Sequence, residues 1–502
     1  MPLNKLVIVG IDAADYQLTR DLMESGDIPR LSAIMDQGSF SLLKSVVPPH
    51  TAPGWTSITT GVNPGKHGIY YFHNFSTTPT TITNSTNTST PRIWDYVGAL
   101  EERSAVVNVP VTYPVHKISG SMVAGIPPWY FDERSVYPGD LIKKLKSEDY
   151  EIDTPMSRGL EKQPEELVNR LLATEEKRLE VFLNLLSETE WSFGMIVFTA
   201  LDRLQHKLVG KGDVENKAVR RGYHEIDRLV GKLVDSLGDQ VNILVVSDHG
   251  FNPRPVAFYP NAWLHAQGLL QRKSSTRYRI TRMLHNLLDG HTFWLPQSMT
   301  KRFQGATVVV NTIEAVDLLK SRAFVPGTDG IIVVKSREDE KSIMSGLSEL
   351  KDDSGKKICS IYTRDQVYKG EKLDSAPQLL IIPRNDVNIV TDPFSHKIVS
   401  SSGNFSKGNH GPNGIFLAAG PSIGKSGSLE VCLEDVAPTA LTLMGIRPPD
   451  YMDGHAIEEI MSEPHPFDTL KPTNVMGQDQ NYAFSLEDEK LVMENLKRLG
   501  YT

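Results

Sequence analysis

The chain has 502 residues, of which 39% are hydrophobic and 23% charged, a composition that excludes a largely disordered protein. Its 53 Lys and Arg against 61 Asp and Glu give a formal net charge of −8, which argues against a nucleic-acid polymer as a partner because such binding rests on a basic surface. The two cysteines, Cys359 and Cys432, exclude a four-thiolate metal site, so a metal would be held by His and carboxylate side chains.

No targeting signal is expected at the start of the sequence. The apolar run from Leu6 to Ile11 is too short for the core of a signal peptide, and it leads directly into Asp12. No stretch approaches about 18 uninterrupted apolar residues, so no membrane span is expected. We therefore expect a cytoplasmic protein, a location that the low number of cysteines also favours. Whether it forms a homo-oligomer is left open.

Short, continuous apolar runs predict buried strands of a parallel sheet, because they lack polar alternation and are rich in β-branched residues. Helical patterns, with apolar residues three and four apart, separate the later runs. In chain order the expected elements are strands at 5–10, 105–109, 193–198 and 241–246 and helices at 163–188 and 214–237. This alternation predicts an α/β fold, a three-layer α/β/α sandwich with a mostly parallel sheet.

Two stretches depart from the alternation. Residues 76–91 are mostly Thr, Ser and Asn without periodicity, which predicts a polar surface loop. Between residues 252 and 403 the pattern blurs, which predicts an inserted subdomain. The predicted parts are a catalytic core of 1–251 and 404–463, the insertion 252–403, and a tail 464–502 with a final amphipathic helix from Leu486 to Leu499.

Acidic residues follow three of the predicted strands. Asp12 comes after the first strand, Asp202 after the strand that ends near residue 198, and Asp248-His249 after the strand that ends at residue 246. The carboxyl ends of parallel strands form the ligand crevice of an open α/β sheet, so these side chains are expected to converge. Singly, an Asp after a strand is more often a helix N-cap or turn residue; their joint occurrence favours a site.

Two further histidines complete a ligand set. His206 lies four residues after Asp202, which places both on one face of a helical turn, and His410 precedes an apolar strand at 415–419. Carboxylate oxygen and imidazole nitrogen suit zinc, with manganese as the alternative. Six ligands exceed the need of one tetrahedral ion and suffice for two divalent ions about 4 Å apart, an arrangement used in phosphoryl transfer.

The segment at 48–61 offers a nucleophile. Pro53 suits the first turn of a short helix that ends near Gly61. Thr51 then lies at the helix N-terminus, where free N–H groups and the positive end of the dipole would hold a phosphate. Its hydroxyl caps the helix by default, but beside two metal ions it would be activated as a nucleophile.

Other polar residues have two interpretations. His67, in the turn at 63–68, faces either the site or the surface. A basic group near and within the insertion binds a substrate carboxylate or phosphate, or forms a solvated face, which is the simpler interpretation. The group comprises Arg254, Arg272, Lys273, Arg277, Arg279 and Arg282.

Together these motifs resemble the alkaline phosphatase superfamily, and within it the type I phosphodiesterase/nucleotide pyrophosphatase branch. The motifs are Gly10-Ile-Asp12, Thr51-Ala-Pro with Thr59-Thr-Gly61, His67-Gly68, Asp202 with His206, Asp248-His249-Gly250, His410-Gly411, and the stretch from Asp435 to Gly454. Their order and approximate spacing match over residues 1–75, 190–255 and 405–460. The insertion is similar to the variable cap of that superfamily.

The resemblance implies two zinc ions with separate ligand sets. One ion would be held by Asp202, His206 and His410. The other would be held by Asp12, Asp248 and His249, together with Thr51 as the nucleophile. The implied reaction is two in-line displacements, in which Thr51 takes the phosphoryl group and water then hydrolyses the phosphothreonine, with net retention at phosphorus.

The sequence departs from the branch at one phosphoryl-binding position. Nucleotide pyrophosphatases carry an Asn shortly after the His-Gly turn, and here Phe72 falls near that place. Asn74, or backbone N–H groups from Ala52 onward, would substitute. The Cys or Ser, Pro and Arg pattern of sulfatases is absent, and no Arg clamp of the phosphomonoesterase kind is evident beside Thr51. A diester tolerates that absence, because its second ester oxygen removes one charge.

The predicted function is a metal-dependent hydrolase of phosphodiester or nucleotide phosphoanhydride bonds in a small phosphorylated substrate, such as a nucleotide. One alternative is a phosphonate hydrolase or a phosphomutase or phosphotransferase on the same scaffold. Another is a non-catalytic binding protein that retains the fold, against which the intact ligand set and Thr51 argue.

Overall fold

The computed structural model describes most of the chain, and its contacts divide it into two compact units. The described residues are 3–74, 81–128, 130–154, 160–210, 212–273, 315–400, 407–427, 429–463, 471–473, 475, 477 and 482–499. The first unit falls within 1–255, 362–377 and 403–501, and the second within 256–361 and 378–402. The second unit lies inside the stretch that the sequence analysis treats as an insertion, whereas residues 362–377 group with the first unit.

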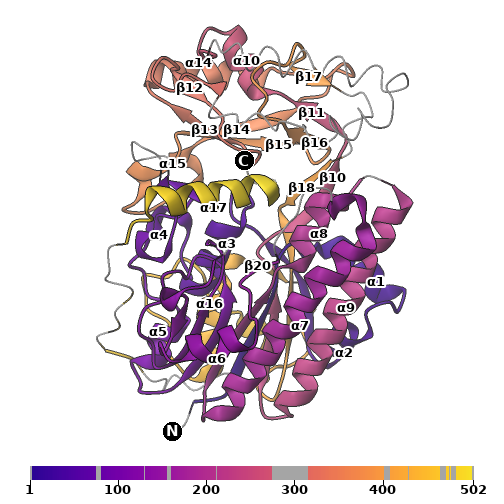
Figure 1. Ribbon diagram of the computed structural model, residues 1–502, viewed down its shortest axis with the longest axis vertical. Coiled ribbons are helices and arrows are strands. Elements are labelled where there is room, and N and C mark those ends of the chain that lie inside the picture. The colour runs from indigo at the N-terminus through magenta and orange to yellow at the C-terminus, as the bar shows by residue number, and fades with distance from the viewer. Residues whose placement is uncertain are drawn as a thin grey trace. The chain divides into compact units, whose positions relative to one another are not determined.

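The first unit contains most of the helices and strands (Figure 1). Its strands are β1 (Leu6–Ile11), β2 (Ser39–Lys44), β3 (His73–Asn74), β4 (Thr81–Ile82), β5 (Ser104–Val109), β6 (Gly120–Ala124), β7 (Val136–Tyr137), β8 (Phe193–Phe198), β9 (Asn242–Val246), β10 (Gly250–Arg254), β18 (Lys407–Gly411), β19 (Asn413–Ala419) and β20 (Glu430–Cys432). Its helices are α1 (Tyr16–Glu24), α2 (Pro29–Gln37), α3 (Thr51–Thr60), α4 (Pro64–His67), α5 (Ile93–Gly98), α6 (Leu141–Ser147), α7 (Pro164–Glu188), α8 (Ala200–Leu208), α9 (Asp213–Leu237), α15 (Arg364–Val367), α16 (Val436–Met444) and α17 (Leu486–Leu499).

A nine-stranded sheet forms the centre of this unit, in the order β20-β2-β19-β9-β1-β8-β5-β6-β7. The neighbours β9, β1, β8, β5 and β6 are parallel, whereas β19 and β7 run antiparallel to their neighbours. All four strands predicted from apolar runs lie in this parallel part, as β1, β5, β8 and β9. The predicted mixed α/β fold with a large, mostly parallel sheet is therefore confirmed.

The strand β1 shows how both faces of the sheet are covered. Val7, Val9 and Ile11 belong to a hydrophobic core shared with α1, α2, α7, α8 and α9. Leu6 and Ile8 belong to a second core, shared with α3, α5 and α16. Because successive strand residues point to opposite faces, the sheet lies between two helical layers, as Figure 1 shows for α7, α8 and α9 on one side and α3 and α16 on the other.

The second unit is smaller, and its described residues form more strands than helices. It holds β11 (Val256–Phe258), α10 (Pro260–Ala266), β12 (Ala323–Phe324), β13 (Ile331–Val334), α14 (Arg337–Ser348), β14 (Cys359–Thr363), β15 (Leu379–Pro383), β16 (Val387–Ile389) and β17 (Val399–Ser400). A four-stranded sheet has the order β12-β13-β15-β14, and a three-stranded one the order β16-β11-β17. A hydrophobic core of its own, which includes Trp263, Ile332 and Leu379, packs between these elements.

The prediction of a polar surface loop at 76–91 is wrong for the described part of that stretch. Within the expected polar surface loop at 76–91, the described part folds into β4 and a helical turn, and Thr83, Asn84 and Ser85 are buried. Their polar atoms find partners inside the protein: Ser85 Oγ donates to the carbonyl of Pro114, and Thr83 Oγ1 to that of Tyr71. The polar composition of this stretch predicted exposed side chains, because composition carries no information about acceptors elsewhere in the sequence. The final helix, in contrast, is confirmed as α17 with the predicted bounds.

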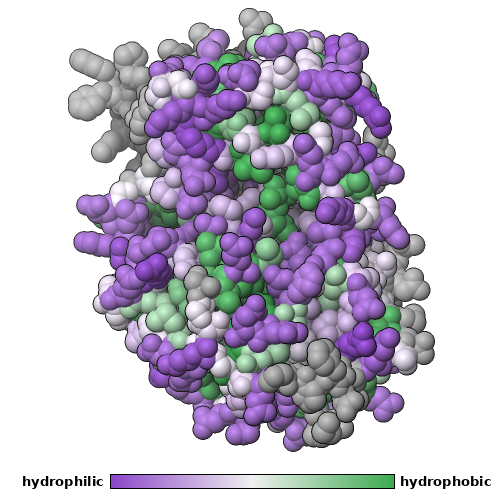
Figure 2. Space-filling model, turned by 180° about the vertical axis from the view of Figure 1, so that it is seen from behind, coloured by the Kyte–Doolittle hydropathy of each residue, from purple (hydrophilic) through white to green (hydrophobic). Residues whose placement is uncertain are grey.

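Hydrophilic side chains cover much of the face drawn in Figure 2, with hydrophobic residues between them. Large hydrophobic residues that are exposed lie far apart in the sequence; examples are Val214, Leu319 and Leu491. In the part of the chain that the structure describes, no helix is both long and apolar enough to span a bilayer.

The candidate active site at the carboxyl edge of the sheet

The predicted ligands converge because three parallel strands end at the same level. In the register of the sheet, Gly10 of β1 pairs with Val197 of β8 and with Val246 of β9. Asp12 therefore emerges next to the start of α8, which carries Asp202, and next to the segment that carries Asp248. Its backbone N–H donates to the carbonyl of Phe198 at 2.8 Å, which continues the ladder one step beyond the strand.

The first cluster joins α8 to β18. Asp202 Oδ1 lies 3.3 Å from His206 Nε2 and 3.4 Å from His410 Nε2. The two Nε2 atoms are themselves 2.9 Å apart. At this distance one ring donates an N–H to the other, and a bound cation would take the place of that proton between the two nitrogens. The cluster also includes His249, since Asp202, His249 and His410 offer ligand atoms within 4.8 Å of one another.

The second cluster consists of Asp12, Asp248 and His249, again with ligand atoms within 4.8 Å. His249 Nε2 lies 3.2 Å from Asp248 Oδ2 and 3.7 Å from Asp12 Oδ1. Both carboxylate oxygens are buried and accept no hydrogen bond among the described residues. Buried oxygens without a donor are costly and uncommon, so this cluster has the form of a site that a cation would complete.

Backbone carbonyls orient two of the histidines. His249 Nδ1 lies 3.0 Å from the carbonyl oxygen of Gly250, and His410 Nδ1 lies 3.3 Å from that of Pro49. A carbonyl only accepts, so the proton of each neutral ring is assigned to Nδ1. The Nε2 lone pairs then face the clusters, which is the usual arrangement of a metal-binding histidine.

Burial and neighbouring charges shift the pKa values of the side chains in both clusters. Burial, together with Asp248 and Asp202, raises the pKa of Asp12 well above its usual value, and burial with Asp202 raises the pKa of Asp248 to about 8. For Asp202 burial acts in the same direction, but His206, His410 and Arg203 hold its pKa well below the usual range. Burial lowers the pKa of His206 and of His249. Cations at the clusters would relieve the repulsion among the carboxylates.

Thr51 begins α3, and its hydroxyl does not cap that helix. His50 is the N-cap, and its Nδ1 accepts from the N–H of Ala52 at 3.1 Å. The buried Thr51 Oγ1 instead lies 3.3 Å from His249 Nε2, beside the second cluster. The default N-cap interpretation of Thr51 is therefore wrong, and the hydroxyl is adjacent to the candidate ligands.

Tight packing of α3 against the strand ends fixes this position. The Trp55 indole Nε1 donates to Asp12 Oδ2 at 3.2 Å, and its ring lies against the end of β1. A Cβ on Gly10 would lie 2.3 Å from the Trp55 ring, so the strand needs glycine at that residue. Sequence reasoning missed Trp55, because nothing in its spacing indicates that it faces Asp12.

Arg203 is a second residue that sequence reasoning missed. It is 1% exposed and donates to Asp202 Oδ2 at 2.6 Å and to Asp153 Oδ2 at 2.9 Å. In the Asp202 to His206 motif it comes directly after the first ligand, a spacing at which two helical residues do not share a face, so the pattern does not indicate its contact with Asp202. The helix α8 also carries Asp202, Gln205, His206 and Lys207, so nothing in the sequence singles out Arg203.

The structure distinguishes between the two interpretations of His67. Its side chain is buried, its Nε2 lies 3.1 Å from Ser57 Oγ, and its Nδ1 accepts from the N–H of Ile69 at 3.1 Å. Burial and the Arg92 charge lower its pKa to about 3. His67 thus joins α3 to the turn after α4 as a neutral hydrogen-bonding group, and the surface interpretation is wrong.

Of the two predicted substrate contacts, Ala52 is in α3 and Asn74 is outside it. Asn74 is in β3 and pairs with Thr81 of β4, and the Phe72 ring packs edge-on against His50 with centroids 4.9 Å apart. The Ala52 N–H, as noted, is bonded to His50. Substrate binding by Asn74 and Ala52 stays a prediction.

The basic residues do not form one solvated face. Arg254 is 6% exposed and donates to the carbonyl of His410, so the solvated interpretation is wrong for it. Arg272 lies over the Phe394 ring in the second unit, and Lys273 is exposed. Arg277, Arg279 and Arg282 lie outside the described residues.

Comparisons with known proteins identify the family and the fold. The family model "Type I phosphodiesterase / nucleotide pyrophosphatase" matches residues 6–413. No curated protein sequence matches the chain significantly.

Solved structures share the fold. Murine ectonucleotide pyrophosphatase/phosphodiesterase 5 is 14% identical with a TM-score of 0.56, and the match covers 91% of this chain and 100% of that one. Phosphonoacetate hydrolase from Sinorhizobium meliloti 1021, in complex with phosphonoformate, is 15% identical with a TM-score of 0.55, over 88% of this chain and 96% of that one. An inactive form of the murine protein was solved in complex with AMP.

Proposed function

The chain belongs to the type I phosphodiesterase/nucleotide pyrophosphatase family, and we propose that it hydrolyses phosphodiester or nucleotide phosphoanhydride bonds through a covalent phosphothreonine intermediate on Thr51. The observation that carries this proposal is the place of the Thr51 hydroxyl, 3.3 Å from His249 Nε2 at the edge of six candidate Asp and His ligands, five of which are buried. A nucleophile beside two carboxylate-and-imidazole clusters is an arrangement suited to phosphoryl transfer.

The residues fit two divalent ions, with zinc as the proposed metal and manganese as the alternative. Asp202, His206 and His410 would hold one ion. Asp12, Asp248 and His249 would hold the other. His249 also lies within reach of the first cluster, so it is the residue that links the two. When bound, such ions lower the pKa of a coordinated hydroxyl or water and neutralise charge on the attacking and leaving oxygens.

Thr51 would carry the reaction in two balanced steps. In the first, Thr51 Oγ1 loses its proton and forms a bond to phosphorus while the bond from phosphorus to the leaving-group oxygen breaks, and that oxygen departs with the electron pair and takes up a proton. In the second, a water oxygen attacks phosphorus from the side opposite Thr51, the bond from phosphorus to Thr51 Oγ1 breaks, and a proton lost by the water regenerates the hydroxyl of Thr51. Two inversions give net retention at phosphorus. The position of Thr51 at the start of α3 turns the positive end of that helix toward the phosphoryl oxygens.

A diester is favoured over a monoester by the charges around the clusters. The nearby guanidinium groups of Arg203 and Arg254 are both buried and engaged, the first with Asp202 and Asp153 and the second with the carbonyl of His410. Phe72, an apolar ring, packs on His50 next to the nucleophile. A phosphomonoester dianion would need a further cationic group, which a diester with one charge does not require.

The assay compares four substrates: a bis-aryl phosphate, an aryl ester of a nucleotide, an aryl phosphomonoester and a phosphonate with a carbonyl-activated C–P bond. The first two are expected to be hydrolysed fastest. The phosphonate arm is included because the fold is shared with phosphonoacetate hydrolase. Dominance of the monoester would contradict the proposal, and dominance of the phosphonate would replace it with C–P cleavage. Thr51→Ala should abolish turnover with unchanged metal content, and retained activity would refute the nucleophile.

A further inference from the structure

A buried arginine links a candidate metal ligand to a distant carboxylate. Arg203 Nη1 donates to Asp202 Oδ2 at 2.6 Å, and Arg203 Nε donates to Asp153 Oδ2 at 2.9 Å. The side chains of Arg203, Asp202 and Asp153 are 1%, 0% and 2% exposed. Charges so completely removed from water persist only when they are paired and hydrogen-bonded.

Because of this contact, the two carboxylate oxygens of Asp202 have different partners. Oδ2 is engaged by Arg203, while Oδ1 faces His206 Nε2 at 3.3 Å and His410 Nε2 at 3.4 Å. A carboxylate held at one oxygen cannot rotate without losing that charged hydrogen bond. Arg203 therefore fixes the direction in which Oδ1 points, toward the two imidazoles.

The geometry requires arginine rather than lysine. The planar guanidinium donates from Nε to one carboxylate and from Nη1 to the other, whereas an ammonium is a single point charge on a flexible stem. Lysine at this position would retain the charge but would satisfy one of the two buried carboxylates poorly.

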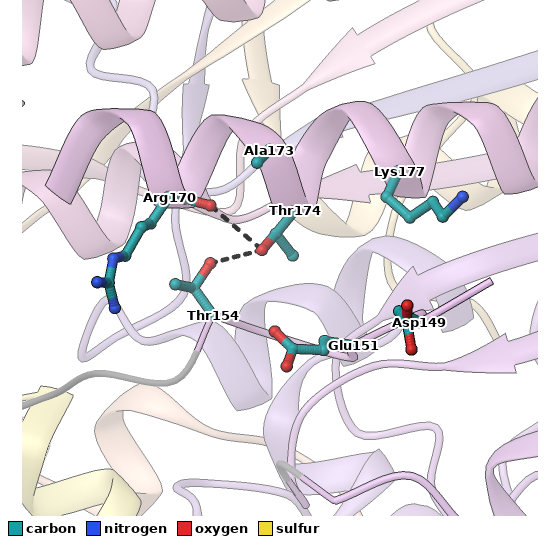
Figure 3. Close-up of a pocket in the computed structure, with 7 residues that line it drawn as sticks. All are labelled: Asp149, Glu151, Thr154, Arg170, Ala173, Thr174 and Lys177. Carbon is teal, nitrogen blue, oxygen red and sulfur yellow. Dashed lines mark hydrogen bonds between the residues drawn. The ribbon is translucent and has the colours of Figure 1, made fainter. Parts of the chain in front are cut away.

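The residues on either side of Asp153 are hydrogen-bonded to α7. Ile152 accepts from Arg178 Nη2 at 2.7 Å, and Thr154 Oγ1 lies 2.7 Å from Thr174 Oγ1 of α7, as Figure 3 shows. The Thr154–Thr174 contact lies at a cavity of about 430 Å³, which is lined by α7 together with Asp149, Glu151 and Thr154. Asp153 is thereby an anchor for Arg203 that does not depend on α8.

A second buried ion pair nearby provides a matched control. Arg178 pairs with Glu175 within α7, and both are buried. Glu175 Oε1 accepts from the N–H groups of Thr199 and Ala200, each at 2.7 Å, at the start of α8. This pair therefore supports the same helix as Arg203 does, and Arg178 also touches the Asp153 segment through the carbonyl of Ile152. Variants of Arg178 thus control for loss of a buried arginine that packs on both segments but contacts neither the Asp153 carboxylate nor a candidate ligand.

We propose that Arg203 is a positioning residue for the metal site of Asp202, His206 and His410, with Asp153 as its anchor. The inference rests on the proposed function, because it presumes that this cluster binds a divalent ion. Residues that orient metal ligands in this way contribute about 10- to 100-fold to metal affinity.

The test measures Zn²⁺ affinity of the full chain, freed of metal and titrated in competition with a chromophoric chelator, and the visible spectrum of the Co²⁺-loaded protein. Arg203→Gln and Arg203→Lys are expected to weaken one of the two binding steps by about tenfold or more and to alter the Co²⁺ spectrum. Asp153→Asn should weaken the same step by a smaller factor. Arg178→Gln and Arg178→Lys should lower the melting temperature but change the affinity less than about twofold, within the context dependence of such contacts.

The outcomes distinguish failure of this inference from failure of the proposed function. Folded Arg203 variants with wild-type affinity at both steps would overturn the inference, as would Arg178 variants that lose as much affinity as the Arg203 variants. If Arg203→Gln does not fold, Arg203→Lys and Asp153→Asn carry the test. Asp202→Asn serves as the reference for loss of the first site. A wild-type protein that binds no divalent ion would overturn the proposed function and this inference together.

Discussion

Replacement of His67 tests whether a buried, neutral histidine makes the protein sensitive to acid. In the folded protein burial and Arg92 lower the pKa of His67 to about 3, from its ordinary value of 6.5. Between these two values the unfolded chain binds a proton that the folded chain does not, so the stability supported by neutral His67 is complete above pH 6.5 and is lost as the pH falls toward 3. Neutral His67 therefore makes the folded protein less stable as the solution becomes acidic.

The magnitude follows from the same two values. Lowering the pH from about 7 to about 5 should cost roughly 2 kcal/mol of unfolding free energy through His67 alone, since each pH unit below the unfolded pKa costs about 1.4 kcal/mol. The variant His67→Gln cannot take up this proton, so its stability should fall by that much less over the same interval.

The measurement is urea unfolding of the metal-free protein at a series of pH values, followed by tryptophan fluorescence, with the wild type and the variant compared at each pH. The exposed His224, whose side chain is 60% accessible, provides the control His224→Gln, which should follow the wild type. Parallel curves for the wild type and His67→Gln would refute the buried, neutral state of His67.

Three further predictions concern the site. Burial and Asp202 raise the pKa of Asp248 to about 8, so its ionised form destabilises the metal-free protein progressively as the pH rises. Asp248→Asn should therefore raise the melting temperature after EDTA treatment at pH 8 and lower it with zinc present; lowering in both conditions would contradict the unbalanced charge. Gly10→Ala should destabilise by about 1–3 kcal/mol in chemical denaturation, because the new Cβ meets Trp55 at 2.3 Å, whereas Gly139→Ala meets nothing within 4 Å and should be neutral; equal effects would rule out the clash. Thr51→Ser should retain turnover of the bis-aryl phosphate and form a phosphoserine detectable by acid quench and mass spectrometry, and activity without any phosphorylated intermediate would speak for direct attack by water.

The central sheet could be predicted because its signal is local. The strands β1, β5, β8 and β9 are continuous apolar runs, buried on both faces, and their sequence alone distinguishes them from half-exposed strands. The carboxyl ends of such strands meet at one edge by geometry, so Asp12, Asp202 and Asp248 could be expected to converge before their distances were known. The periodicity of α17 was local in the same way.

Burial of polar residues was not predictable, because the partners that make it tolerable are distant in the sequence. His67 hydrogen-bonds to Ser57, Ser85 to Pro114, and Arg203 to Asp153, across 10, 29 and 50 residues. The sequence by itself determined the sheet and the kinds of residue at its edge. Only the tertiary structure decided which polar groups leave water, since a buried charge or hydroxyl is stable only where the fold supplies its partner.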